Sequence, residues 1–149
     1  MISASHPAGP VVSGSGQPST VCAPDPDAAT LPNFLIIGAG KSGTTSLWNY
    51  LDQHPQIGML AIKEPSFFSM DEVHDRGLAW YRRLFAGHAG AVARGEASNS
   101  YSATDTFPKT IDRIAATLPD PRFVYIVRHP RARTESDWME RQRIAPVAE

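Results

Sequence analysis

The chain has 149 residues, of which 42% are hydrophobic and 19% are charged, a composition typical of one globular domain. Its 14 lysines and arginines nearly balance 15 acidic residues, so charge gives no support for a nucleic-acid or membrane partner. It has a single cysteine, which rules out an internal disulfide, and neither a signal peptide nor a transmembrane stretch is recognisable. We therefore expect a cytoplasmic location.

Residues 1–31 are rich in Ser, Gly, Pro and Ala and contain no lysine or arginine. Such a segment buries too little apolar surface to offset the entropy lost on ordering. We expect a disordered tail over residues 1–31 and one folded domain over residues 32–149.

Within this domain, strands and helices are expected to alternate. The apolar run at 33–37, closed by Gly38, predicts a strand buried on both faces, and a helix follows over 44–53. The other expected elements are strands at 57–62, 91–97 and 122–127, the last also buried, and helices at 77–85, 107–118 and from Pro130 onward. This alternation predicts an α/β fold with a mostly parallel sheet flanked by helices. Such folds normally have more strands, so we expect the C-terminal part to be missing.

The sequence Gly-Ala-Gly-Lys-Ser-Gly at 38–43 forms a tight loop between the first strand and helix. Backbone N–H groups, the helix dipole and the charge of Lys41 together predict a phosphate site. The P-loop of nucleotide triphosphatases, G-x-x-x-x-G-K-[ST], would place its first glycine at Leu35, in mid-strand. The strand at 122–127 is followed by Arg128, not by an aspartate that could hold magnesium. A magnesium-dependent kinase or NTPase is therefore the poorer alternative.

The loop instead resembles that of sulfotransferases that use 3′-phosphoadenosine 5′-phosphosulfate (PAPS), especially bacterial and heparan-sulfate types. Their pattern, G-x-x-K-[SG]-G-T-[TRS]-[SA]-L, matches residues 38–47. The resemblance implies that Lys41 stabilises the leaving phosphate as the S–O bond breaks, with no metal needed. It also implies that PAPS is bound by the loop residues Gly40, Lys41, Ser42, Gly43, Thr44 and Thr45.

Two further segments strengthen the resemblance. Residues 63–68, Lys-Glu-Pro-Ser-Phe-Phe, are similar to the family's K-E-x-x-F-F segment, which implies that Glu64 is the general base that deprotonates the acceptor. Residues 128–136 resemble the 3′-phosphate motif R-[DN]-P-x-x-R-x-x-S, with a histidine at the second position. This match implies that Arg128 and Ser136 bind the 3′-phosphate that distinguishes PAPS from ATP, while Arg133 stabilises the loop.

Residues 95–101 resemble the bacterial form G-E-x-[ST]-P-x-Y. Two interpretations of Glu96 stay open, a part of the acceptor pocket or a structural hydrogen-bonding group. Heparan-sulfate-type relatives carry a lysine where this chain has Ala97, which weakens the case for a glycosaminoglycan acceptor.

The sequence thus predicts the N-terminal part of a sulfotransferase that transfers a sulfuryl group from PAPS to a hydroxyl or amine and releases PAP. The acceptor is expected to be a small molecule or a glycan, with no nucleic-acid or membrane partner. The acceptor's identity, the oligomeric state and the activity of this short chain stay open. A non-catalytic nucleotide-binding remnant is the second alternative.

Overall fold

A computed structural model describes residues 31–144, so the expected tail lies outside the described residues except for Leu31. That residue is only 5% exposed and packs in the main hydrophobic cluster. The folded part therefore includes Leu31, one residue before the expected domain boundary.

The expected strands and helices form at nearly the predicted positions. The strands are β1 (Phe34–Gly38), β2 (Ile57–Met59), β3 (Ala93–Ala97) and β4 (Arg122–Tyr125). The main helices are α1 (Thr44–Asp52), α3 (Leu78–Leu84), α4 (Thr110–Thr117) and α5 (Pro130–Ile144). Three short elements were not predicted: α2 (Asp71–His74) and the 3₁₀ turns η2 (Ala86–His88) and η3 (Asn99–Ser102).

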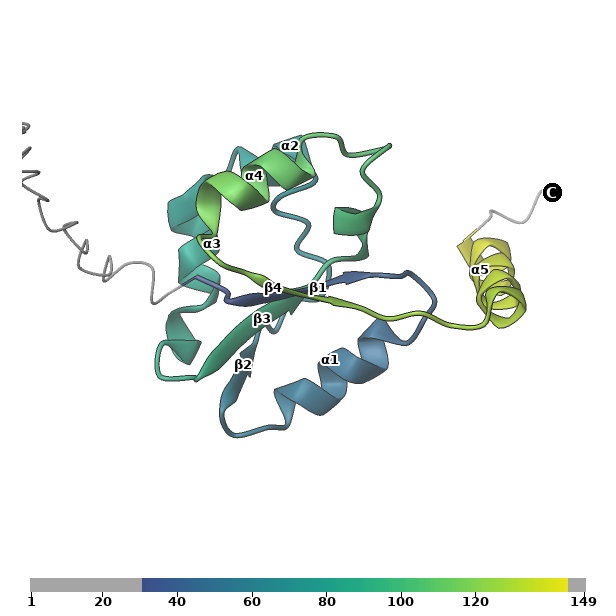
Figure 1. The fold of residues 1–149 in the computed structure, drawn as a ribbon, viewed down its shortest axis with the longest axis horizontal. Coiled ribbons are helices and arrows are strands. Elements are labelled where there is room, and N and C mark those ends of the chain that lie inside the picture. Colours follow the sequence, from purple (N-terminus) through teal and green to yellow (C-terminus); the bar gives the residue numbers. More distant parts are fainter. Residues whose placement is uncertain (1–30, 145–149) are drawn as a thin grey trace, which may run out of the picture.

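The described strands form one parallel sheet in the order β2-β3-β1-β4, so the predicted α/β class is confirmed. Helix α1 covers one face, α3 and α4 cover the other, and α5 lies beyond the end of β4 (Figure 1). Central strand β1 pairs with β3 and β4, and its Leu35 and Ile36 are fully buried, as a strand covered on both faces requires.

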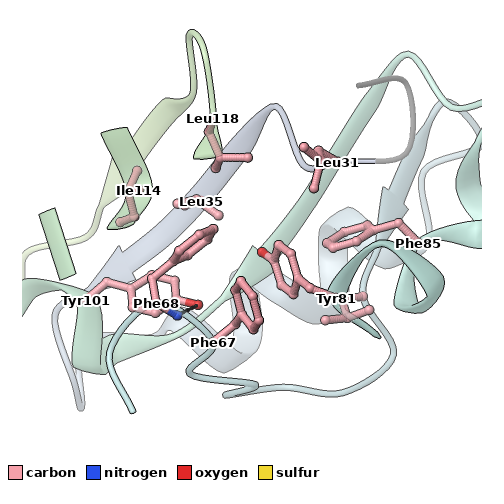
Figure 2. Packing of buried hydrophobic residues seen from close by; sticks show 10 residues of the cluster. Leu31, Leu35, Phe67, Phe68, Tyr81, Phe85, Tyr101, Ile114 and Leu118 are labelled. Atoms are coloured by element: carbon pink, nitrogen blue, oxygen red, sulfur yellow. Dashed lines mark hydrogen bonds between the residues drawn. The ribbon is translucent and has the colours of Figure 1, made fainter. Parts of the chain in front are cut away.

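The larger hydrophobic cluster lies on the α3 and α4 side of the sheet (Figure 2). Phe67 and Phe68, both at most 1% exposed, anchor the segment that follows β2. The Phe67 ring stacks on Tyr81 at 4.2 Å between centroids, and Phe68 meets Tyr81 edge to face at 5.3 Å. This packing fixes the backbone next to Glu64.

The expectation that strand 122–127 is buried is wrong for this structure. Phe123, Tyr125 and Val127 are 54%, 52% and 78% exposed. In the described part of the chain β4 is the outermost strand and pairs only with β1. Its side chains are as apolar as those of a central strand, but no described strand or helix covers most of them.

The four strands of the described sheet are parallel, so the segments that leave their carboxyl ends meet at one edge of the sheet. These are the loop after Gly38, the segment that contains Glu64, the turn that begins at Asn99, and Arg128. In open α/β sheets this edge is where ligands bind.

Substitution of Gly38 by alanine should destabilise the fold. Gly38 has a φ of 149°, and a Cβ there would lie 2.7 Å from Ser102 Oγ and 3.0 Å from the Tyr125 ring. We expect Gly38→Ala to lower the free energy of unfolding by about 2 kcal/mol or more. Gly40→Ala is the matched control: no atom lies within 4 Å of its Cβ position, so its effect should stay within about 0.5 kcal/mol. Urea unfolding followed by circular dichroism measures both, and equal effects would contradict the steric argument.

Candidate functional site

An open pocket of about 380 Å³ lies at the carboxyl ends of the strands. It is lined by residues from four separate segments: Lys41, Gly43, Thr44, Thr45, Lys63, Glu64, Asn99, Arg128, Ser136 and Glu140. Seven of the predicted site residues are thereby brought together. The other two, Gly40 and Ser42, belong to the same loop but do not line the pocket.

The glycine-rich loop has the geometry of an anion site. Lys41 has a left-handed φ of 63°, and Gly43 caps α1 with a φ of 102°. The first N–H groups of a helix have no partner within it, and they carry the positive end of the helix dipole. Ser42 Oγ is buried and has no hydrogen-bond partner among the described residues. Unpartnered donors of this kind fit a phosphate or sulfate group.

Two arginines hold the loop from outside. Arg128 Nη1 donates to the carbonyl oxygen of Lys41 at 3.2 Å, and Arg133 Nε donates to that of Gly40 at 3.0 Å. Both side chains tie α5 and the segment before it to the loop. Arg133 does not line the pocket, which agrees with the expectation that it stabilises the loop. Arg128 does line it and has further N–H groups that can bind an anion.

The carboxylate of Glu64 is oriented by three donors. The Asn99 backbone N–H donates to Oε2 at 2.7 Å, Asn99 Nδ2 donates to Oε1 at 2.7 Å, and Lys63 Nζ lies 2.6 Å from Oε1. Glu64 itself has a left-handed φ of 59°, held by its N–H bond to the carbonyl oxygen of Ala97 at 2.8 Å. A non-glycine residue pays a conformational cost there, which is common at functional sites.

Sequence reasoning missed Lys63, Asn99 and Glu140 as pocket residues. Glu140 Oε2 lies 3.3 Å from Lys41 Nζ, so a carboxylate already neutralises the loop lysine. Its position, four residues after Ser136 on α5, puts both on one helix face, and that spacing could have indicated it. Asn99 could not be found this way, because its role depends on the turn that follows β3.

Glu96 lies in the core and does not line this pocket, so the structural interpretation of its role is the one that holds. It is fully buried and accepts hydrogen bonds from the hydroxyls of Tyr81, Tyr101 and Ser98. Burial raises the pKa of Glu96 to about 7, although these hydrogen bonds act in the opposite direction. Ala97 is also buried, at 1% exposure.

A larger cavity of about 580 Å³ between α4 and β4 is lined mainly by apolar residues and contains no charged side chain. It therefore offers no cation that could bind an anion. Among residues 31–144, no group of three or more His, Cys, Asp or Glu side chains could hold a metal ion. The same part of the chain contains no helix long and apolar enough to cross a bilayer.

A parallel α/β sheet with a glycine-rich loop between its central strand and first helix is the architecture of P-loop-type folds. The family model "Sulfotransferase domain" matches residues 31–148 of the chain. The chain therefore belongs to the sulfotransferase family, as the sequence motifs indicated.

Curated relatives agree with this assignment. Human "Heparan sulfate glucosamine 3-O-sulfotransferase 6" is 36% identical over 125 residues, which span 84% of this chain and 35% of that protein. "Membrane-associated sulfotransferase kil1" of Dictyostelium discoideum is 31% identical over 140 residues, or 88% of this chain and 29% of that protein. The chain thus spans about a third of the length of these relatives.

A solved sulfotransferase from Alicyclobacillus acidocaldarius has the same fold. It superposes with a TM-score of 0.67 and 35% sequence identity, over 80% of this chain and 53% of that one. The resemblance in the sequence motifs therefore extends to the three-dimensional arrangement of the strands and helices.

The buried Glu96 should give the fold a measurable pH dependence. Its pKa is raised from 4.5 to about 7 on folding, so the folded protein retains a proton that the unfolded chain releases. The corresponding stability is complete below pH 4.5 and is lost as the pH rises through about 7, on the order of 3 kcal/mol in all. Urea unfolding across this range should show the loss in the parent and in the exposed-site control Glu72→Gln. A Glu96→Gln variant should not show this loss of stability. If its free energy of unfolding fell with pH as steeply as that of the parent, Glu96 would not be the group responsible.

Proposed function

We propose that this chain binds PAPS in the pocket at the carboxyl ends of its strands and takes part in sulfuryl transfer to an acceptor hydroxyl or amine. The observation that carries the proposal is the convergence of Lys41, Glu64 and Arg128, from three sequence motifs, on one pocket. Family membership supports the donor, since the sulfotransferase family implies PAPS.

The donor would lie along the loop and α5. The 5′-phosphosulfate would contact the N–H groups of residues 40–45, the Lys41 ammonium and the hydroxyls of Thr44 and Thr45. The 3′-phosphate would contact Arg128 and Ser136, which both line the same pocket. Because Glu140 now pairs with Lys41, the entering anion must displace that carboxylate.

The proposed chemistry needs one base and one cation. The acceptor oxygen attacks sulfur and forms a new O–S bond while the bond from sulfur to the 5′-phosphate oxygen breaks. Glu64 takes the acceptor proton, and Lys41 neutralises the charge that develops on the departing phosphate. The products are the sulfated acceptor and PAP. Glu64 is suited to this role because its carboxylate lines the pocket and is held by Asn99.

Two observations bear on the acceptor. The human relative is named as a heparan sulfate glucosamine 3-O-sulfotransferase, which supports a sugar hydroxyl as the acceptor. Ala97, whose replacement of a lysine spoke against a glycosaminoglycan, is buried in the core and does not line the pocket. It therefore carries less weight against a glycan than the sequence suggested.

A non-catalytic nucleotide-binding protein is the second candidate. The chain spans about a third of the relatives' length, so the donor pocket can be present without the surface that holds an acceptor. Such a protein would bind PAP and transfer nothing.

Donor binding can be tested with PAP and isothermal titration calorimetry. Lys41→Ala and Arg128→Ala should each weaken binding by roughly 10- to 100-fold, because each removes a charge-assisted contact to a phosphate. Arg131→Ala is the matched control, since Arg131 lies at the start of α5, close to Arg128 in the chain, but pairs with Glu135 and does not line the pocket. Magnesium-ATP should bind much more weakly than PAP. If Arg128→Ala bound PAP as tightly as the parent, the assignment of the 3′-phosphate would be wrong.

Transfer can be tested separately with radiolabelled PAPS and acceptors that include heparan-sulfate oligosaccharides. Glu64→Gln keeps the size of the side chain but cannot accept a proton. It should keep PAP affinity while lowering turnover by roughly 10²- to 10⁴-fold. A parent that binds PAP without any transfer would favour the non-catalytic candidate, and full turnover in Glu64→Gln would remove it as the base.

A further inference from the structure

The proposed chemistry leaves a fully buried carboxyl group unused. Glu96 lies in β3 with 0% exposure, and no cation is among its hydrogen-bond partners. Tyr81 Oη donates to Oε1 at 2.5 Å, Tyr101 Oη donates to Oε1 at 2.7 Å, and Ser98 Oγ donates to Oε2 at 2.9 Å. Burying a carboxyl group costs free energy of folding. Its contribution to the structure therefore depends on the groups that its hydrogen-bond partners contact in turn.

Two of these partners continue to the segment that contains Glu64. Ser98 Oγ accepts a hydrogen bond from the backbone N–H of Ser66 at 3.0 Å. Tyr101 Oη accepts one from the N–H of Phe68 at 3.4 Å, and these two residues lie side by side in the core (Figure 2). The carboxylate is thus linked through one hydroxyl to each of two amides within four residues of Glu64.

The direction of these bonds depends on the charge of Glu96. An ionised carboxylate only accepts hydrogen bonds, so Ser98 and Tyr101 must each use their single hydroxyl proton on it. Their oxygen lone pairs are then left to accept the Ser66 and Phe68 N–H groups. A protonated carboxyl, or the amide of a glutamine, adds a donor and removes this fixed order.

The segment held in this way has an unfavourable backbone. Among the described residues, the non-glycine residues with positive φ are Lys41, Glu64 and Ser66, at 63°, 59° and 55°. Each such residue costs on the order of 1 kcal/mol or more, so its surroundings must hold it in place. For Ser66 those surroundings include the Ser98 hydroxyl and, at 3.2 Å, the Ser100 hydroxyl.

We propose that Glu96 is a positioning residue, which acts through Ser98 and Tyr101 to hold residues 64–68 in the conformation that presents Glu64 to the pocket. This inference rests on the proposed role of Glu64 as the base. It assigns the buried carboxyl group a function in the reaction without any contact to substrate.

The inference implies that protonation of Glu96 loosens the segment. The ionisable groups that face Glu96 are the hydroxyls of Tyr81 from α3 and Tyr101 from η3, with the Glu64 charge acting at longer range. Burial raises the pKa of both tyrosines well above the usual value, so they stay protonated donors throughout the neutral range. Glu96, with a pKa of about 7, is the member of this group that titrates there.

The test compares Glu96→Gln, Ser98→Ala and Tyr101→Phe with the control Tyr50→Phe, whose side chain is 73% exposed on α1. The backbone amide signals of Ser66 and Phe68 are followed by ¹⁵N NMR across neutral pH. In the parent and the control both signals should shift with a midpoint near 7, and in Glu96→Gln they should not titrate. Tyr101→Phe should speed amide hydrogen exchange at Phe68, and Ser98→Ala should do so at Ser66.

Kinetics provide the second readout. Glu96→Gln should lower kcat by roughly 10- to 100-fold, as expected for a displaced catalytic group, while the PAP affinity and the KM for PAPS stay within about twofold of the parent. A purely structural role would change donor affinity and kcat together. If the Ser66 and Phe68 amide signals change neither with pH nor with the Glu96→Gln substitution, the inference is wrong. If Glu96→Gln does not fold, the amide exchange of Ser98→Ala and Tyr101→Phe, which each remove one of the two hydrogen-bonded links, tests the inference.

The outcomes separate this inference from the proposed function. A parent that does not bind PAP, or binds it without transfer, refutes the proposed function while the amide signals still show whether Glu96 controls residues 64–68. A parent that transfers sulfate, together with unchanged amides and kcat in Glu96→Gln, refutes only the positioning role.

Discussion

The hydrogen bonding of β1 along both of its edges is the constraint on which the whole site depends. Phe34 is aligned with Gly95 of β3 on one side and with Arg122 of β4 on the other. The pairing continues beyond the strand, since the Ser98 N–H bonds to the Ile36 carbonyl oxygen and the Ala39 N–H bonds to that of Ile126. Because this parallel register fixes where each strand ends, the segments that contain Lys41, Asn99 and Arg128 lie next to one another at the same edge of the sheet.

The pocket contains both signs of charge. Lys63 pairs with Glu64 and Lys41 with Glu140, while Arg128 binds a loop carbonyl oxygen. These partly exposed ion pairs are individually weak, and an incoming multivalent anion can replace them at modest cost. The arrangement keeps the cations in place without a ligand, and both carboxylates are groups that can accept a proton.

The sequence was sufficient where structure is decided locally. The loop at 38–43, the Lys-Glu-Pro-Ser-Phe-Phe segment at 63–68 and the arginine–serine spacing at 128–136 are each continuous motifs, and the structure brings residues from all three to one pocket. Asn99 and Glu140 escaped because their roles arise only when η3 and α5 pack beside the loop. The exposure of Phe123 and Tyr125 was not predicted either. An apolar strand has the same sequence pattern whether or not a neighbouring element covers it.

Glu96 shows how a core residue can resist interpretation from sequence. Its motif suggested either an acceptor contact or a structural group, and only the hydroxyls of Tyr81, Ser98 and Tyr101 decide between them. Tyr81 lies in α3, Tyr101 in η3 and Ser98 between β3 and η3, 2 to 15 residues away from Glu96 in the chain. No single-sequence pattern reports such a network.

The uncovered edge of β4 has a consequence for how the isolated polypeptide behaves in solution. Phe123 and Tyr125 are exposed on β4, whose outer backbone groups have no strand partner in the described sheet, and Val127 is exposed just after the strand. An exposed edge with apolar side chains invites strands of other molecules to add. Colloidal stability, rather than thermodynamic stability of the core, should therefore limit the concentration at which this chain can be handled.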